Sequence, residues 1–296
     1  MMLFQVVLPV FLIFLVGYIG QKILSLHIKS ISTAALYLIT PALIFRNFYT
    51  TALDATYLYM LIYVVLLSSI LIIVIKGVAF LKGYDQSQLS ALILAAAFMN
   101  NGNFGAPIML FAYGELAFQY SIAIMIIHVL LMSTLGVYYA AKGNFNPKDS
   151  LYSVLKMPIL HALFLGLLWQ YLNLPMPANI YNAIDLVADA AIPIIMLVLG
   201  MQLAEIKLLK VQWGITSIGL IIRLLISPAI AYGLTLILPV EPLLAKVMIV
   251  LGAMPSAAFT VLYAIQYDSS PELVSSITFI STILSLLTLS ILLTIL

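Results

Sequence analysis

The chain has 296 residues, of which 65% are hydrophobic and only 7% are charged. A soluble domain carries about 25% charged residues, so this composition excludes a soluble catalytic domain. The formal net charge of +2 gives no indication of a nucleic-acid partner, and the absence of cysteine excludes disulfides and thiolate metal sites.

Apolar segments alternate with short polar or Pro- and Gly-containing stretches along the whole chain. A helix needs about 20 residues to cross a hydrocarbon core about 30 Å thick. The sequence therefore predicts an all-α integral membrane protein with ten transmembrane helices. In chain order these segments are 2–21, 31–49, 57–81, 88–112, 117–141, 151–172, 179–203, 210–238, 242–266 and 272–295.

Basic residues gather on one side of the predicted membrane. Nine lysines follow segments 1, 3, 5 and 7, whereas the other side holds Arg46 and Lys246. The positive-inside rule makes the first side cytoplasmic, including the loop KGNFNPKDS at 142–150. We therefore expect a protein of the cell (inner) membrane with both termini extracytoplasmic.

The two halves of the chain resemble each other. We interpret 1–141 and 151–296 as two five-helix repeats, joined by a cytoplasmic linker at 142–150. With five spans in each half, the second repeat must be inverted relative to the first, as in many secondary transporters. Matching residues recur at an offset that rises from 149 to 157: Pro9 and Pro158, Gly17 and Gly166, Gln21 and Gln170, Pro41 and Pro193, and Glu115 and Glu272.

Segments 4 and 9 are interrupted at corresponding places. Segment 4 contains MNNGNFGAP at 99–107, and segment 9 contains GAMPSAAFT at 252–260. Two such breaks indicate a binding site at the membrane midplane. Each break starts a half-helix whose unpaired N–H groups favour an anion such as a carboxylate. The alternative is a pair of packing kinks, which is our interpretation of Pro41 and Pro193.

The predicted substrate site is built from these two breaks. A packing kink does not need three Asn residues, so the stretch 99–107 favours a site. Amide and hydroxyl groups would contact the anion, and the half-helix N-termini would neutralise its carboxylate. The predicted substrate-binding residues are Asn100, Asn101, Asn103, Gly105, Pro107, Pro255, Ser256 and Ala257.

Four groups of residues form short motifs in these segments: Asn100, Gly105 and Pro107; Ile192, Pro193, Leu197, Leu199 and Gly200; Arg223 and Pro228; and Pro255, Ala264, Gln266 and Tyr267. These motifs are similar to those of the auxin efflux carrier family, which includes the plant PIN-type carriers and prokaryotic members. The resemblance spans nearly the whole chain, although each motif is short. The plant carriers have Pro at the position of Met99, and their long cytoplasmic loop is reduced here to 142–150, which indicates a prokaryotic type.

The resemblance implies a particular arrangement of the ten helices. Segments 4 and 9 would cross as broken helices. Segments 1, 2, 6 and 7 would form a scaffold domain that often dimerises, which implies a homodimer. Segments 3–5 and 8–10 would form the transport domain.

Ionisable groups at membrane depth are functional candidates, because they are costly there. Asp185 and Asp189 lie four residues apart on one helix face, where one could carry a coupling proton or both could be solvated. Arg223 is expected to pair structurally or to contact the substrate. His128 and His161 are expected to be hydrogen-bonded packing residues or proton relays.

The sequence predicts no enzyme, because it contains no HExxH motif and no nucleophile–base pair. It also contains no Walker A loop, which argues against ATP-driven pumping. Our leading hypothesis is a secondary transporter of a small organic anion, such as an auxin-like acid, a dicarboxylate or an amino-acid derivative. The alternatives are a ligand-sensing membrane subunit that binds at the same crossover without transport, and a channel. We predict no cofactor and no metal site, with uniport, H⁺ coupling and Na⁺ coupling left open, and membrane lipid as the surroundings.

Overall fold

The computed structural model describes residues 6–51, 54–141, 152, 154–206 and 211–296. The predicted linker 142–150 therefore lies outside the described residues, as do Lys207 and Lys210. In the first half the elements are α1 (Leu8–Leu24), α2 (Ile28–Ala34), η2 (Ala35–Ile39), α3 (Thr40–Thr50), α4 (Ala55–Lys82), α5 (Gln86–Ala97), η3 (Asn101–Gly105), α6 (Ala106–Leu131), η4 (Met132–Gly136) and α7 (Val137–Ala140). In the second half they are α9 (Pro158–Tyr171), α10 (Ala178–Glu205), α11 (Trp213–Ile221), η5 (Ile222–Ile226), α12 (Ser227–Ile237), α13 (Pro242–Gly252), α14 (Phe259–Gln266) and α15 (Pro271–Ile295).

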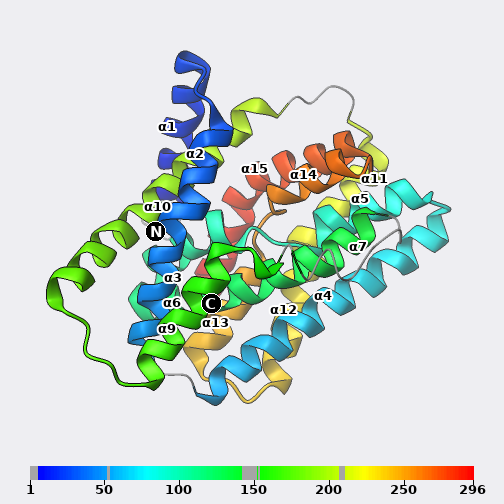
Figure 1. Cartoon of the computed structure of the whole chain (residues 1–296). Coiled ribbons are helices and arrows are strands. Elements are labelled where there is room, and N and C mark those ends of the chain that lie inside the picture. The colour runs from blue at the N-terminus through cyan, green and yellow to red at the C-terminus, as the bar shows by residue number, and fades with distance from the viewer. Residues whose placement is uncertain (1–5, 52–53, 142–151, 153, 207–210) are drawn as a thin grey trace.

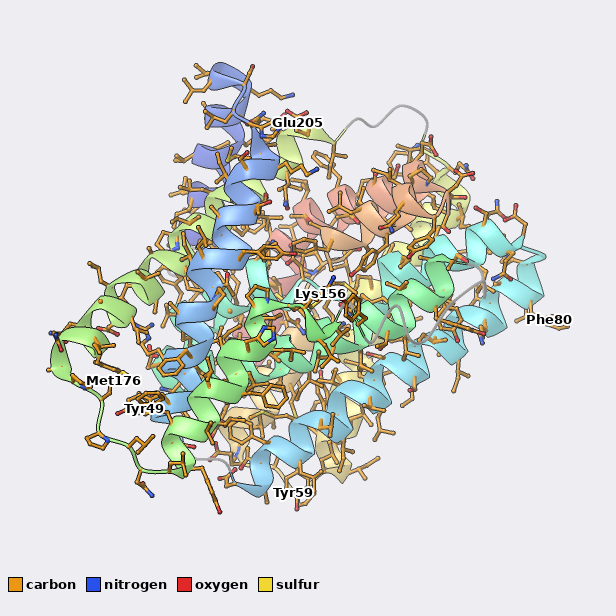
Figure 2. The ribbon with its side chains drawn as sticks, viewed as in Figure 1. Tyr49, Tyr59, Phe80, Lys156, Met176 and Glu205 are labelled. Carbon is orange, nitrogen blue, oxygen red and sulfur yellow. The ribbon has the colours of Figure 1, made fainter. Side chains whose placement is uncertain are left out.

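The described part of the chain is helical, apart from loops and one isolated β-bridge. Six of its helices are long and apolar enough to cross a membrane, and four shorter apolar helices accompany them. Each of the ten predicted segments contains helix. Many large apolar side chains point outward, such as Phe80, which is 86% exposed at the end of α4 (Figure 2). Such a surface suits contact with lipid rather than water.

One group of helices lies together at one side of the molecule (Figure 1). It comprises α1, α2, η2, α3, α9 and α10, which correspond to predicted segments 1, 2, 6 and 7. The most extensive contacts in the molecule join α1 to α10 and α3 to α9. Glycines make these contacts close, since a Cβ atom on Gly17 or Gly200 would collide with a carbonyl of the facing helix.

The second group contains α4, α5, α6, α7 and α11–α15, and within it α5 packs against α4, α7, α11, α14 and α15. A capping box starts α5, in which Asp85 accepts from the Gln88 N–H and the Gln88 side chain accepts from the Asp85 N–H. Every residue from Ala91 to Phe98 is fully buried, so this short helix is enclosed by its neighbours on all sides. The end of α5 is therefore held in the centre of the group.

Prolines mark places where the helices widen. Pro41, Pro107 and Pro228 each occupy the second position of an α-helix that follows a π-helical turn. Proline lacks an N–H, so an upstream carbonyl loses its usual partner and the helix widens locally. The structure thus places Pro107 inside the first turn of α6 rather than at the break itself. The predicted boundary between segments 4 and 5 lies at Gly114, whose φ of 79° interrupts α6.

Candidate functional site

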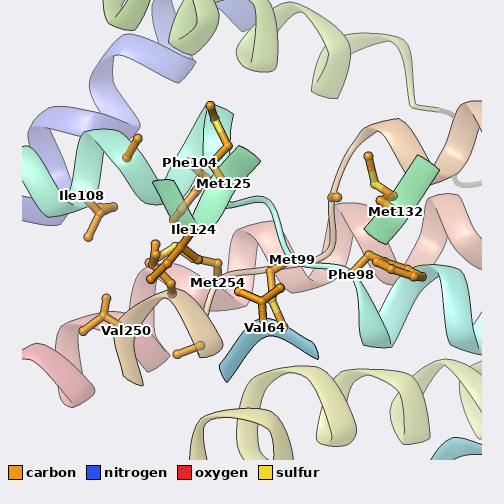
Figure 3. Close-up of a cluster of buried hydrophobic side chains, with 14 of the residues drawn as sticks. Val64, Phe98, Met99, Phe104, Ile108, Ile124, Met125, Met132, Val250 and Met254 are labelled. Atoms are coloured by element: carbon orange, nitrogen blue, oxygen red, sulfur yellow. The ribbon is translucent and has the colours of Figure 1, made fainter. Parts of the chain in front are cut away.

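The interrupted parts of segments 4 and 9 lie against each other in the centre of the second group. The chain leaves α5 after Ala97 and leaves α13 after Gly252. Two backbone hydrogen bonds then pair the segments in antiparallel fashion: the Asn100 N–H donates to the Pro255 carbonyl (2.9 Å), and the Ala257 N–H donates to the Phe98 carbonyl (3.0 Å). We call residues 98–101 and 253–257 the crossover. Apolar side chains, including Phe104 and Met254, surround it (Figure 3).

Proline and glycine fit their places at the crossover. Pro255 contributes only its carbonyl to the pairing, so its missing N–H costs no hydrogen bond there. Gly105 lies close to the end of α13, where a Cβ atom would come within 2.6 Å of the Leu251 side chain. The small residue therefore allows the half-helix that begins at Asn101 to pack against the end of α13.

Two buried amides at the crossover have unused hydrogen-bonding groups. Asn100 is 5% exposed and its Nδ2 atom has no partner, and Asn101 is 3% exposed and its Oδ1 atom has none. The Asn101 amide contacts Nδ1 of His128 at 2.9 Å, while Nε2 of His128 accepts from the Met99 N–H at 3.4 Å. Asn103 is half-buried. A buried polar atom without a partner is costly, and these are the two such side-chain atoms that the structure places within the crossover.

A row of hydroxyl groups on α15 supports the other arm of the crossover. The Ser256 N–H donates to the hydroxyl of Ser281 (3.2 Å), and the Thr278 hydroxyl donates to that of Ser256 (3.1 Å). These three residues are at most 1% exposed. This row was not predicted from the sequence, although the spacing by three and four residues at 278, 281, 282 and 285 places these residues on one face of a helix.

Arg223 lies in the second group without exposed surface. Its Nη1 atom donates to the Ala96 carbonyl at 3.0 Å, and its Nη2 atom donates to the Gly252 carbonyl at 2.5 Å and to the Ser227 hydroxyl. Among the described residues, no carboxylate pairs with it. Of the two roles that the sequence left open, the contacts show structural pairing with carbonyl groups.

Asp185 and Asp189 are not at the crossover. Both accept hydrogen bonds from Nη1 of Arg46, at 2.7 and 2.6 Å, and so join α10 to α3. These three residues line a cavity of about 350 Å³. On its other side the cavity is lined by Glu115, Phe118 and Gln119 of α6. It thus opens between the two groups of helices, away from the residues that pair at the crossover.

Most of the predicted site residues fall into two sets in the structure, while Asn103 and Gly105 lie in η3 and Pro107 in the first turn of α6, just beyond the crossover. The first set lies at or next to the crossover, where its members are joined by the backbone pairing, by the contact of Asn101 with His128 and by the bonds of Arg223 to carbonyl groups. It consists of Asn100, Asn101, Pro255, Ser256, Ala257, His128 and Arg223. Asp185 and Asp189 form the second set, beside the cavity. His161 is exposed on α9 and belongs to neither. Asn47 and Gln119 also line the cavity, and the sequence analysis did not predict them, because one or two polar residues change the mean hydropathy of an apolar segment little.

Broken helices that pair at the centre of an apolar helical protein are a feature of many secondary transporters. Comparison with known proteins identifies the family. The chain belongs to the membrane transport protein family, whose model matches residues 2–147 and 145–293. The predicted resemblance to auxin efflux carriers is confirmed, and the chain is a prokaryotic-type relative of them.

Three relatives illustrate the range of the family. An uncharacterized transporter of Methanocaldococcus jannaschii is 30% identical over 96% of this chain and 95% of its own length. A Rhizobium meliloti protein named as a candidate malonate transporter is 23% identical over 95% of this chain and 92% of its own. Auxin efflux carrier component 6 of Arabidopsis thaliana is 26% identical over 44% of this chain and 24% of its own. The family and these relatives are membrane transporters rather than enzymes, and the chain is an integral membrane protein.

Proposed function

We propose that this protein is a secondary transporter that moves a small organic anion across the cell membrane by alternating access. The observation that carries this proposal is the crossover, where two buried Asn amides with unused hydrogen-bonding groups lie beside the paired breaks. Asn100, Asn101, Asn103 and Ser256 would contact the substrate. Gly105, Pro107, Pro255 and Ala257 would shape the backbone around it.

The proposal includes two inverted repeats of five helices, related by a two-fold axis. The two hydrogen bonds of the crossover support it. Ala257 lies 157 residues after Asn100, and Pro255 lies 157 residues after Phe98. A two-fold axis that relates these pairs would superimpose the Asn100–Pro255 hydrogen bond on the Ala257–Phe98 hydrogen bond. The same offset relates Met99 to Ser256, which face each other in the bridge. Any antiparallel bridge relates its own residues in this way, so the support comes from the value of the offset, which equals the 157 residues between Glu115 and Glu272.

The electrostatics of the crossover favour an anion. Half-helices begin on the far side of each break, at Asn101 and at Phe259, and helix N-termini carry about half a positive charge each. Their first N–H groups lack partners within the helix. The unpartnered Nδ2 atom of Asn100 adds another donor. A carboxylate can accept several such bonds at once.

In this proposal the two groups of helices are a scaffold domain, α1–α3 with α9 and α10, and a transport domain that contains the crossover. The transport domain would rock against the scaffold and expose the crossover to each side in turn. The cavity beside Asp185 and Asp189 lies at the boundary between the groups, so it is the proposed approach to the site. Either carboxylate could carry a coupling proton. The orientation with 142–150 in the cytoplasm and dimerisation through the scaffold also remain part of the proposal.

The proposed substrate class follows from the crossover and from the names of the relatives. Auxin and malonate, which appear in those names, are both carboxylic acids. One carries a single carboxyl group on an aromatic body and the other carries two on one carbon. Both fit an anion site made of amides and helix N-termini, so a small carboxylate is the common chemistry.

Charge movement in proteoliposomes tests the proposal. Purified protein would be exposed to a panel of monocarboxylates, dicarboxylates and aromatic acids, in parallel with uptake of radiolabelled acids to detect electroneutral transport. Asn100→Ala should reduce saturable transport to background while the protein remains folded in the membrane. Asn179→Ala is the matched control, because Asn179 is exposed near the start of α10 and should transport like the wild type.

Three results would have distinct meanings. Saturable transport in the wild type and in Asn179→Ala, but not in Asn100→Ala, would establish the crossover as the site. Normal transport by Asn100→Ala would refute the site. Binding of an acid without any flux would instead favour the sensing subunit that the sequence left as the alternative.

A further inference from the structure

The crossover has a negative side as well as a positive one. Two half-helices end there: α5 at Ala97 and α13 at Gly252. The last carbonyl groups of a helix have no partners within it and together carry about half a negative charge. Two such ends facing each other therefore present roughly one negative charge within a buried region.

Arg223 lies between these two ends. It donates to the Ala96 carbonyl of α5 and to the Gly252 carbonyl of α13, and Ser227 donates to the same Gly252 carbonyl at 2.7 Å. One guanidinium thus joins the C-termini of both half-helices. Its single positive charge is close in size to the combined partial charges of the two ends.

Helix C-termini and unwound carbonyls at a broken-helix site commonly bind the coupling cation of a secondary transporter, most often Na⁺. A metal cation in this chain would need the Ala96 and Gly252 carbonyls and the Ser227 hydroxyl as ligands. These oxygens already accept from, or lie beside, the guanidinium. Arginine does not lose its proton in proteins, so the positive charge is permanent.

We propose that Arg223 is a built-in cation of the crossover. It takes the place of a coupling metal ion at the ends of α5 and α13, so that anion binding and transport need no monovalent metal cation. The same guanidinium neutralises the negative ends and leaves the positive N-termini of the other two half-helices available to the substrate. Arg223 is thus a positioning residue, and its part in transport rests on the proposed function.

The end of α13, which Arg223 binds, also contacts α4 and α12. Tyr63 on α4 donates its hydroxyl to the Met248 carbonyl at 2.5 Å, one turn before the end of α13. A Cβ atom on Gly252 would lie 2.6 Å from the Ala231 side chain and 3.0 Å from the Tyr63 hydroxyl. The end of α13 is therefore fixed from several sides.

Thermal unfolding in two salts tests the inference without any transport. Purified wild-type protein would be unfolded in detergent with increasing sodium chloride, and with choline chloride at the same ionic strength. The unfolding midpoint should be the same in both salts. Arg223→Gln, which frees the oxygens and removes the charge, should show a higher midpoint in sodium chloride than in choline chloride. A saturable sodium effect in the wild type, or no sodium effect in Arg223→Gln, would overturn the inference.

Uptake measurements give a second readout. Arg223→Gln should lower the initial rate of organic-anion uptake by about tenfold or more, because a buried charge with its hydrogen bonds is lost. Arg223→Lys, which retains the charge, should recover part of the rate and remains informative if the Gln variant does not fold. Lys246→Gln is the control, because it also removes a positive charge near α13. The Lys246 ammonium binds the Leu296 carbonyl and no group of the crossover, so this variant should transport like the wild type.

The two proposals can fail separately. Wild-type protein that moves no organic anion would refute the proposed function, while the comparison of the two salts would still decide on Arg223. Wild-type uptake that requires sodium, or a normal rate in Arg223→Gln, would refute the role of Arg223 and leave organic-anion transport established.

Discussion

Gly17 in α1 lies directly against the backbone carbonyl of Leu197 in α10, where a Cβ atom would collide with the oxygen. Gly166 in α9 makes the corresponding contact with the carbonyl of Phe45 in α3, at 2.9 Å from the position of an added Cβ atom. An offset of 149 residues carries Gly17 to Gly166, and one of 152 carries Phe45 to Leu197. Each half of the chain thus makes the same close contact with the other, which supports the proposed inverted repeat.

This contact gives a first prediction. Gly17→Ala should lower the free energy of unfolding by about 1–3 kcal/mol, because the new methyl group must push α1 away from α10. Gly20→Ala on the same helix is the control, since no atom lies within 4 Å of its added Cβ. Thermal unfolding of both purified variants in one detergent measures the difference. Equal midpoints for the two variants would contradict the close contact.

The sequence predicted the helices better than the contacts between them. Hydropathy placed the segments because burial in lipid acts on each segment by itself. The breaks at Asn100 and Pro255 were also visible, since polar residues, Gly and Pro are costly in an apolar helix. That the two breaks belong to one site followed from the internal repeat, and that the two helices cross followed from the family resemblance, because no local property of 99–107 identifies a partner 157 residues away.

The polar contacts beyond the breaks could not be predicted for the same reason. The sequence left Arg223 without a partner, because its partners are backbone carbonyls at the ends of two other helices. Arg46 pairs with two carboxylates about 140 positions further along the chain, and it was counted only as a loop charge. Such pairs depend on how the helices pack, which a pattern of apolar residues does not specify.

A second prediction concerns the hydroxyl of Ser281, which accepts from the Ser256 N–H at the crossover. Ser281→Ala should lower the free energy of unfolding by about 1–3 kcal/mol, because a buried N–H is left without an acceptor. It should also slow anion uptake, since Ser256 belongs to the proposed site. Ser290→Ala on the same helix removes only a hydroxyl bonded to the Leu286 carbonyl and should change both quantities little. Unfolding and uptake are measured on the same preparations, and identical behaviour of the two variants would argue against a role for Ser281.

A third prediction separates the two roles that the sequence left open for His128. The structure shows it 3% exposed, with both ring nitrogens facing crossover groups, the Met99 N–H and the Asn101 amide. If His128 positions Asn101, His128→Leu should reduce uptake nearly as much as Asn100→Ala, while His128→Asn should retain part of it with an unchanged pH profile. His161→Asn is the control, because His161 is exposed on α9. A flattened pH profile in His128→Asn would instead assign His128 to proton transfer.

A fourth prediction tests the coupling proton. Asp189 is the more exposed of the two carboxylates that accept from Arg46, with 67% of its side chain accessible against 42% for Asp185. Asp189→Asn should flatten the pH dependence of uptake and leave the fold intact, because Asp185 retains its bond to Arg46 and an exposed ion pair contributes about 0–1 kcal/mol. Initial uptake rates over a series of external pH values measure this, with unfolding midpoints from the same preparations.

Asp185→Asn is the matched variant, since it removes the neighbouring carboxylate and leaves Asp189 in place. A wild-type pH profile in Asp189→Asn would exclude Asp189 as the proton carrier, and an equal loss in both variants would assign the effect to the Arg46 pair as a whole.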